Sequence, residues 1–120
     1  MISIRALRPD DIRAVMKLVA EAGFPSRSAE GWHWAFFENP DQAGFPEGLV
    51  AERDGRIISM IGLQTRTFSM SGRTVPVTCG HTFISSHDGR GAGFALAKRA
   101  LAGEGAAATY SLNNLSLVHI

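Results

Sequence analysis

His87-Asp88-Gly89-Arg90-Gly91-Ala92-Gly93-Phe94 is the stretch of this sequence that decides its fold. It follows an apolar run at 75–84 that is typical of a strand, and it opens an amphipathic helix predicted over 94–101. A strand, a glycine-rich turn and a helix N-terminus present unpaired backbone N–H groups to an anion such as phosphate. Glycine suits such a turn because a Cβ blocks close approach and because a turn can require positive φ. The alternative is a solvated turn that caps a helix.

Two common phosphate-binding loops do not match this stretch. A Walker loop needs Gly-Lys followed by Ser or Thr, whereas the residues at 91–93 include no lysine. A dinucleotide-binding loop needs a third glycine where Phe94 stands, and an acidic residue about 20 positions later. The residues at 110–112 are Tyr, Ser and Leu, so that acid is missing.

The remaining elements follow from hydrophobic periodicity and turn residues. A strand is predicted at 2–6, a helix after Pro9, a second helix at 28–37 with Ser28 as its cap, and a last strand at 107–112. Asp54-Gly55 and Ser71-Gly72 each join two strand-like runs and predict hairpins, while Pro76 indicates a sheet edge or a bulge. In the helix after the glycines, the side chains expected to face the core are Phe94, Ala97 and Leu101.

Residues 88–93 resemble the acetyl-CoA pyrophosphate loop of the GNAT superfamily of N-acetyltransferases, which reads Q/R-x-x-G-x-G/A. Asp88 stands where that family has Gln or Arg, and Arg90 offers a compensating charge. The segments IRALRPDDI (4–12), WHWAFFENP (32–40) and VAERDGRIIS (50–59) are also similar to family segments. The resemblance implies an α/β (α+β) fold of order β-α-α-β-β-β-α-β, with a mixed, mostly antiparallel central sheet and flanking helices.

The resemblance also implies a function and a set of site residues. The expected reaction is direct transfer of an acetyl group from acetyl-CoA to the amine of a small molecule or peptide. The pantetheine arm of acetyl-CoA is expected at Phe83, Ile84, Ser85 and Asn113. The pyrophosphate is expected at Asp88, Gly89, Arg90, Gly91, Ala92, Gly93 and Phe94.

In this family the general base is usually a carboxylate on or near the strand before the loop, but residues 75–84 contain no Asp or Glu. His81 is the residue of that strand whose pKa suits a base, and Tyr110 on the next strand is a second candidate. The alternative for His81 is a structural histidine. Cys79 is interpreted as a small buried hydrophobe, and the four scattered histidines give no metal-binding spacing.

The family often continues after the fifth strand with N-x-x-A/S-x-x-x-Y. Asn113 and Ser116 fit its first positions, but Ile120 then stands at the tyrosine that protonates the leaving thiolate; if Asn114 is the family Asn instead, the tyrosine position falls one residue after Ile120. We therefore expect residues 1–120 to form a single GNAT-like domain that lacks the last strands. A non-catalytic acyl-CoA-binding or remnant module completed by a second chain is the alternative. An exposed last strand would also permit a homodimer.

Composition excludes several other classes of protein. The net charge is +1 and the basic residues are scattered, which argues against a nucleic-acid partner. No apolar run approaches the roughly 20 residues that span a bilayer, and the first residues lack a signal-peptide core, so no membrane partner is expected. The single cysteine, Cys79, fits a cytoplasmic location.

Overall fold

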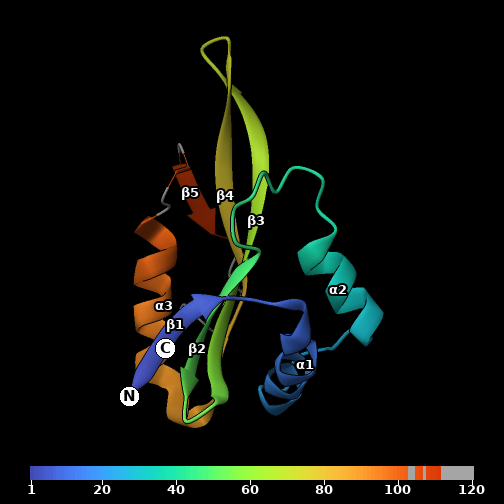
Figure 1. The fold of residues 1–120 in the computed structure, drawn as a ribbon, viewed down its shortest axis with the longest axis vertical. Coiled ribbons are helices and arrows are strands. Elements are labelled where there is room, and N and C mark those ends of the chain that lie inside the picture. The colour runs from blue at the N-terminus through green and yellow to red at the C-terminus, as the bar shows by residue number, and fades with distance from the viewer. Residues whose placement is uncertain (103–104, 107, 112–120) are drawn as a thin grey trace.

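The computed structural model describes residues 1–102, 105–106 and 108–111 of the 120-residue chain. Figure 1 shows a central sheet with helices on both faces and a long hairpin that projects from one end. The elements, in chain order, are β1 (Ile2–Ala6), a 3-10 turn (Pro9–Asp11), α1 (Ile12–Glu21), α2 (Ala29–Phe37), β2 (Gly48–Arg53), β3 (Arg56–Met70), β4 (Arg73–Ser85), a 3-10 turn (His87–Gly89), α3 (Arg90–Ala102) and β5 (Ala108–Ser111).

The sheet has the order β1-β2-β3-β4-β5, so each strand lies beside its neighbour in sequence. The first three pairs are antiparallel, whereas β4 and β5 are parallel because α3 connects them. Helices α1 and α2 lie on one face and α3 lies on the other (Figure 1). The predicted fold class, mixed sheet and element order are therefore confirmed.

Both hairpins turn where the sequence predicts. Asp54 and Gly55 have φ values of 53° and 73°, and Ser71 and Gly72 have 52° and 77°. Positive φ at both central residues is what a type I′ turn requires, and this turn matches the twist of the flanking strands. Pro76 lies on the part of β4 that extends past the β5 pairing, which begins at Val77. It therefore occupies a free edge within the described residues.

Two apolar clusters hold the layers together. The cluster under α1 and α2 comprises Leu7, Ile12, Val15, Leu18, Val19, Trp32, Phe36, Val50, Met60 and Ile84. The cluster under α3 comprises Leu49, Ala51, Ile58, Ile61, Leu63, Ala92, Leu96 and Ala100. Ser28 caps α2 by accepting a hydrogen bond from the N–H of Gly31 at 3.0 Å, as its position in the sequence predicts.

The orientation predicted for α3 is wrong. The helix begins at Arg90 rather than at Phe94, and its buried side chains belong to Ala92, Leu96 and Ala100. Phe94 is 79% exposed and Leu101 is 65% exposed. The side chains that face the sheet recur every four residues, so that Leu96 enters the core while the small Ala92 and Ala100 on either side let the helix backbone approach the sheet.

A β-bulge interrupts β4 beside the middle of β3. Gly62 pairs with His81 and Met60 pairs with Ile84, so two residues of β4 oppose the single residue between Met60 and Gly62. Thr82 lies in the bulge with a φ of 50°. The bulge changes the side-chain alternation, so that Ile84 faces α1 while Phe83 packs against the cluster under α3.

Candidate active site

Among the described residues, the last part of β4 is paired along one edge, and its other edge is open. Its pairing with β5 extends from Val77 to Gly80, whereas its pairing with β3 continues to Ser85. Within the described ranges, no strand pairs with the other edge of β4 beyond Gly80. The backbone of residues 81–85 therefore leads along an open edge to the start of α3.

Of the four residues predicted to hold a pantetheine arm, the three that the structure describes, Phe83, Ile84 and Ser85, point their side chains into the protein. Ile84 is buried under α1, and Phe83 packs against the cluster under α3. The Ser85 hydroxyl lies 2.7 Å from the hydroxyl of Ser59, and either can donate the hydrogen bond. An extended ligand along this edge would consequently meet backbone groups rather than these side chains.

Because Gly89 and Gly93 have no side chains, the turn before α3 and the first turns of α3 can pack closely against the sheet. A Cβ on Gly89 would collide with the backbone carbonyl oxygen of Ile58, and one on Gly93 would collide with the hydroxyl of Ser85. None of the three glycines in this stretch has positive φ, so the conformational reason expected from the sequence does not apply. Close packing accounts for Gly89 and Gly93.

Gly91 has a different environment. Apart from its chain neighbours and the backbone of its own helix, no described atom lies within 4 Å of the position that a Cβ on Gly91 would occupy. It belongs to the first turn of α3, where backbone N–H groups lack partners within the helix and the helix dipole favours negative charge. This open space beside N–H donors fits an anionic group. Ala92, by contrast, is buried and faces the sheet.

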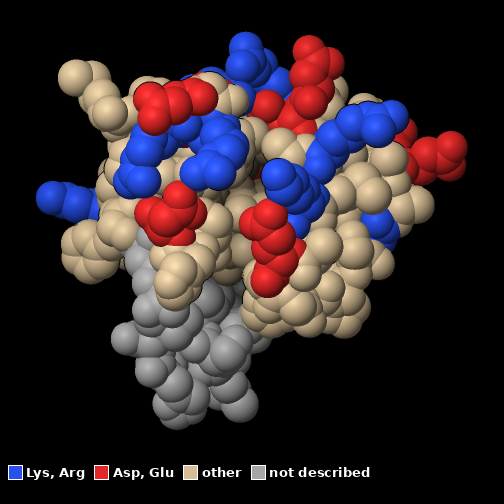
Figure 2. All heavy atoms as spheres, turned by 90° about the horizontal axis from the view of Figure 1, so that it is seen from below, with Lys and Arg blue, Asp and Glu red and all other residues tan. Residues whose placement is uncertain are grey.

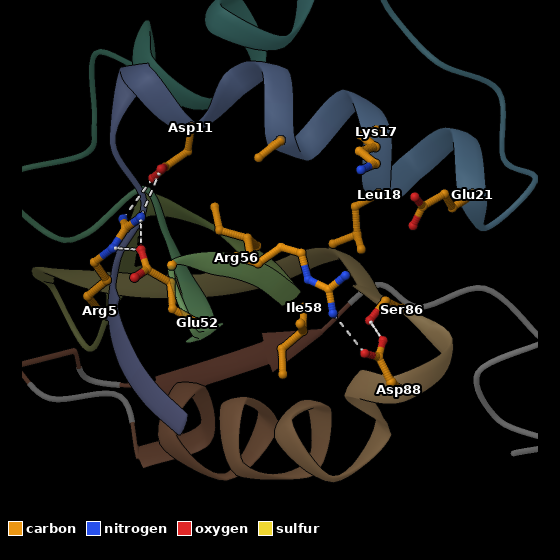
Figure 3. A pocket seen from close by; sticks show the side chains of 13 residues that line it. Arg5, Asp11, Lys17, Leu18, Glu21, Glu52, Arg56, Ile58, Ser86 and Asp88 are labelled. Atoms are coloured by element: carbon orange, nitrogen blue, oxygen red, sulfur yellow. Dashed lines mark hydrogen bonds and ion pairs between the residues drawn. The ribbon is translucent and has the colours of Figure 1, made fainter. Parts of the chain in front are cut away.

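Asp88 is bound to the turn between β2 and β3. Arg56 donates a hydrogen bond from Nη2 to Oδ2 of Asp88 at 3.0 Å, and Ser86 donates one to Oδ1 at 2.8 Å (Figure 3). The bond from Ser86 is the largest cause that lowers the pKa of Asp88, and the charge of Arg56 lowers it further. Asp88 is therefore ionised near neutral pH, and both of its oxygens have protein partners.

A cavity of about 360 Å³ lies between α1, the β2–β3 turn and residues 86–88. Figure 2 shows basic and acidic side chains interleaved over this end of the molecule. The charged side chains that line the cavity belong to Arg5, Asp11, Lys17, Glu21, Glu52, Arg56 and Asp88. The sequence analysis did not identify this cavity, because its residues come from four separate stretches of sequence and no motif joins them.

Arg5 fixes one side of this cavity. It donates hydrogen bonds to both oxygens of Asp11, at 2.8 and 2.9 Å, and it also binds Glu52 (Figure 3). The hydrogen bond to Asp11 is the main cause that raises the pKa of Arg5. Burial alone would raise the pKa of Asp11, but the hydrogen bonds from Arg5 and from the N–H of Arg8 lower it overall. The three side chains thus form a salt-bridged group that joins β1, β2 and the 3-10 turn before α1.

His81 lies on the face of the sheet that α2 covers. Its imidazole stacks on the ring of Phe36 with centroids 5.6 Å apart, and its Nδ1 is 2.9 Å from the hydroxyl of Thr82. Burial is the main cause that lowers the pKa of His81, and the positive charge of Arg27 lowers it further. The imidazole is therefore neutral at pH 7, which is the form that accepts a proton.

Several predicted site features fall where the structure gives no side chains. Asn113, Ser116 and Ile120 lie outside the described residues, and for Arg90 and Tyr110 only the backbone is described. The described residues include no group of three or more His, Cys, Asp or Glu placed to hold a metal ion. None of the described helices is long and apolar enough to cross a membrane.

Comparison with known proteins identifies the fold. No family model matches the sequence, and no curated protein is significantly similar to it. A putative acetyltransferase from Agrobacterium tumefaciens superposes with a TM-score of 0.73 at 20% identity, over 98% of this chain and 86% of that one. Glucosamine-6-phosphate N-acetyltransferase from Arabidopsis thaliana gives 0.69 at 14% identity, over 97% and 84%. The chain has the GNAT fold.

A third GNAT-like neighbour was solved with ligands. Diaminobutyrate acetyltransferase from Paenibacillus lautus, in complex with L-2,4-diaminobutyric acid and coenzyme A, matches with a TM-score of 0.59 at 16% identity. That match covers 82% of this chain and 55% of the other. The GNAT fold explains why the open β4 edge and the N-terminus of α3 are adjacent, since one short turn at His87–Gly89 connects them.

Proposed function

We propose that this chain is an N-acyltransferase that moves an acetyl group from acetyl-CoA to an amine. The observation that carries the proposal is the edge of β4 at residues 81–85, along which no described strand pairs and which leads directly to the exposed first turn of α3 at Gly91. An extended arm along the edge and a pyrophosphate at the helix N-terminus would match these two surfaces. The acetyltransferase neighbours favour transfer over the binding-only alternative.

The residues that would hold the co-substrate act mainly through their backbone. N–H groups at Arg90 and Gly91 would bind the pyrophosphate, and residues 83–85 would bind the pantetheine arm as an added strand would. Acetyl-CoA would supply an activated thioester carbonyl. The attacking amine forms the C–N bond, the C–S bond breaks, and the thiolate takes up a proton. Backbone N–H groups of β4 near Thr82 would stabilise charge on the carbonyl oxygen.

His81 is the proposed general base. It is neutral at pH 7 because burial lowers its pKa, and it lies beside the bulge at Thr82. A neutral imidazole can remove the proton of the amine, directly or through a water molecule. The acceptor class is an amine, because neighbours are named for the amines diaminobutyrate and glucosamine-6-phosphate.

The first experiment is calorimetric titration of the chain with acetyl-CoA, compared with Gly91→Glu. The Cβ of the Glu would meet no described atom outside its own helix turn and chain neighbours, and the carboxylate would lie near a helix N-terminus, so the fold should survive. Its charge should nevertheless abolish binding of a pyrophosphate. Ala102→Glu adds the same charge at the exposed far end of α3 and is the matched control.

We expect micromolar binding by the wild type and Ala102→Glu, and none by Gly91→Glu. Release of free thiol on addition of simple amines would then establish transfer. If the folded wild type does not bind, the proposal is wrong. Binding without thiol release against a broad amine panel would instead support an acyl-CoA-binding module.

A further inference from the structure

Asp88 places a negative charge next to the proposed pyrophosphate site. It lies two residues before Arg90, where α3 begins, and three before the uncovered Gly91. An ionised carboxylate near the site lowers the affinity of the protein for a pyrophosphate unless a cation neutralises the carboxylate. The contacts of Asp88 show which cation does so.

Arg56 is that cation, and it comes from a different part of the chain. It is the first residue of β3 and follows the Asp54-Gly55 turn. Its guanidinium reaches across the cavity to Oδ2 of Asp88, while Ser86 holds Oδ1 (Figure 3). The carboxylate of Asp88 is thus directed toward the β2–β3 turn.

We infer that Arg56 is a positioning residue for the co-substrate: by pairing with Asp88 it neutralises that carboxylate and keeps it directed away from the anion. This inference rests on the proposed function. It assigns a role to the β2–β3 turn, which lies outside the glycine-rich stretch. Arg56 acts through Asp88 and need not touch the ligand itself.

The exposure of the pair is compatible with this role and also with a competing one. The side chains of Arg56 and Asp88 are 66% and 53% exposed, so the pair contributes little to stability. Arg56 could alternatively leave Asp88 and bind a phosphate directly. The two roles differ in what happens when both side chains are neutralised.

A double-mutant cycle separates these roles, with the dissociation constant of coenzyme A as the readout. The variants are Arg56→Gln, Asp88→Asn and the double substitution. Arg73→Gln removes the same charge from the distant β3–β4 hairpin and is the control. We expect Arg56→Gln to weaken binding about tenfold at low salt, because it removes the cation that is hydrogen-bonded to Asp88 and leaves the bond from Ser86 in place. The Asp88→Asn variant and the double variant should both bind at least as well as the wild type.

Three results would overturn the inference. The first is binding by Arg56→Gln that equals that of Arg73→Gln, which would show that the pair is irrelevant to the ligand. The second is a double variant as weak as Arg56→Gln, which would show that Arg56 contacts the ligand directly. The third is a wild type that binds no coenzyme A, in which case the proposed function fails as well. Thermal unfolding of each variant confirms that rescue by Asp88→Asn reflects charge and not folding.

Discussion

The imidazole of His81 lies over Gly62, in the space that a side chain at position 62 would occupy. A Cβ on Gly62 would be 2.7 Å from Nε2 of His81 and 2.8 Å from the ring of Phe36. The absence of a side chain on β3 therefore determines where the proposed base on β4 can lie. His81 is held between Gly62 and Phe36, next to the bulge at Thr82.

Gly62→Ala should displace His81. The added methyl group collides with the imidazole and with Phe36, so we expect a loss of about 1–3 kcal/mol in the free energy of unfolding. Transfer activity should fall further than binding of coenzyme A, because the open edge of β4 is a backbone feature. Steady-state thiol release and calorimetry on the same preparation test this. Equal losses of kcat and of affinity would contradict the assignment of His81.

The stability of the chain should depend on the protonation of His81. Its pKa is lowered from 6.5 by burial and by Arg27, so the unfolded chain binds a proton at a higher pH than the folded chain. The contribution of neutral His81 to the free energy of unfolding is therefore fully present above pH 6.5. It is lost as the pH falls from 6.5 toward the lowered pKa of the folded chain, by at most about 1.4 kcal/mol per pH unit. Urea unfolding at several pH values should show that the free energy of unfolding depends less steeply on pH in His81→Gln than in the wild type. Identical slopes would mean that burial does not shift this group.

The three glycines of the decisive stretch should respond differently to alanine. Gly91→Ala should stabilise the protein by about 0.5–1 kcal/mol, because the methyl group meets no atom and alanine favours a helix. Gly89→Ala should be the most destabilising, since its Cβ would collide with the backbone of Ile58. Gly93→Ala should lie between them, because the hydroxyl of Ser85 can rotate. Thermal denaturation gives the order, and a destabilised Gly91→Ala would contradict the structure.

The face that α3 buries can be tested directly. Leu96→Ala should cost about 2–5 kcal/mol, because Leu96 is completely buried. Phe94→Ala should change stability by no more than about 0.5 kcal/mol, since Phe94 is 79% exposed. Chemical denaturation of both variants is sufficient. A larger loss of stability for Phe94→Ala than for Leu96→Ala would instead support the helix orientation that was predicted from the sequence.

Much of the fold is predictable because local signals and turn chemistry agree. The Asp54-Gly55 and Ser71-Gly72 turns determine both hairpins, and the periodicity of Ile12, Val15 and Val19 gives the buried face of α1. The direction of α3 is not predictable in this way. The sequence analysis expected Phe94, Ala97 and Leu101 to face the core, whereas the cluster under α3 takes in Ala92, Leu96 and Ala100.

The candidate site is predictable only where it is local in sequence. The glycine-rich stretch and its position before a helix can be recognised in the sequence. The sequence does not show that Gly89 and Gly93 are needed for close packing whereas Gly91 leaves open space. The pairing of Arg56 with Asp88 spans 32 positions and depends on the register of β3 and β4. No periodicity or motif carries such information, because it arises only when the sheet forms.

The bulge at Thr82 makes the length of β4 as important as its composition. Insertion or deletion of one residue there would reverse which face Phe83, Ile84 and Ser85 present. Phe83 would be driven toward α1 and Ile84 toward α3, so both clusters would lose a fitting partner at once. Homologous chains should therefore tolerate substitutions along this strand far more readily than changes in its residue count.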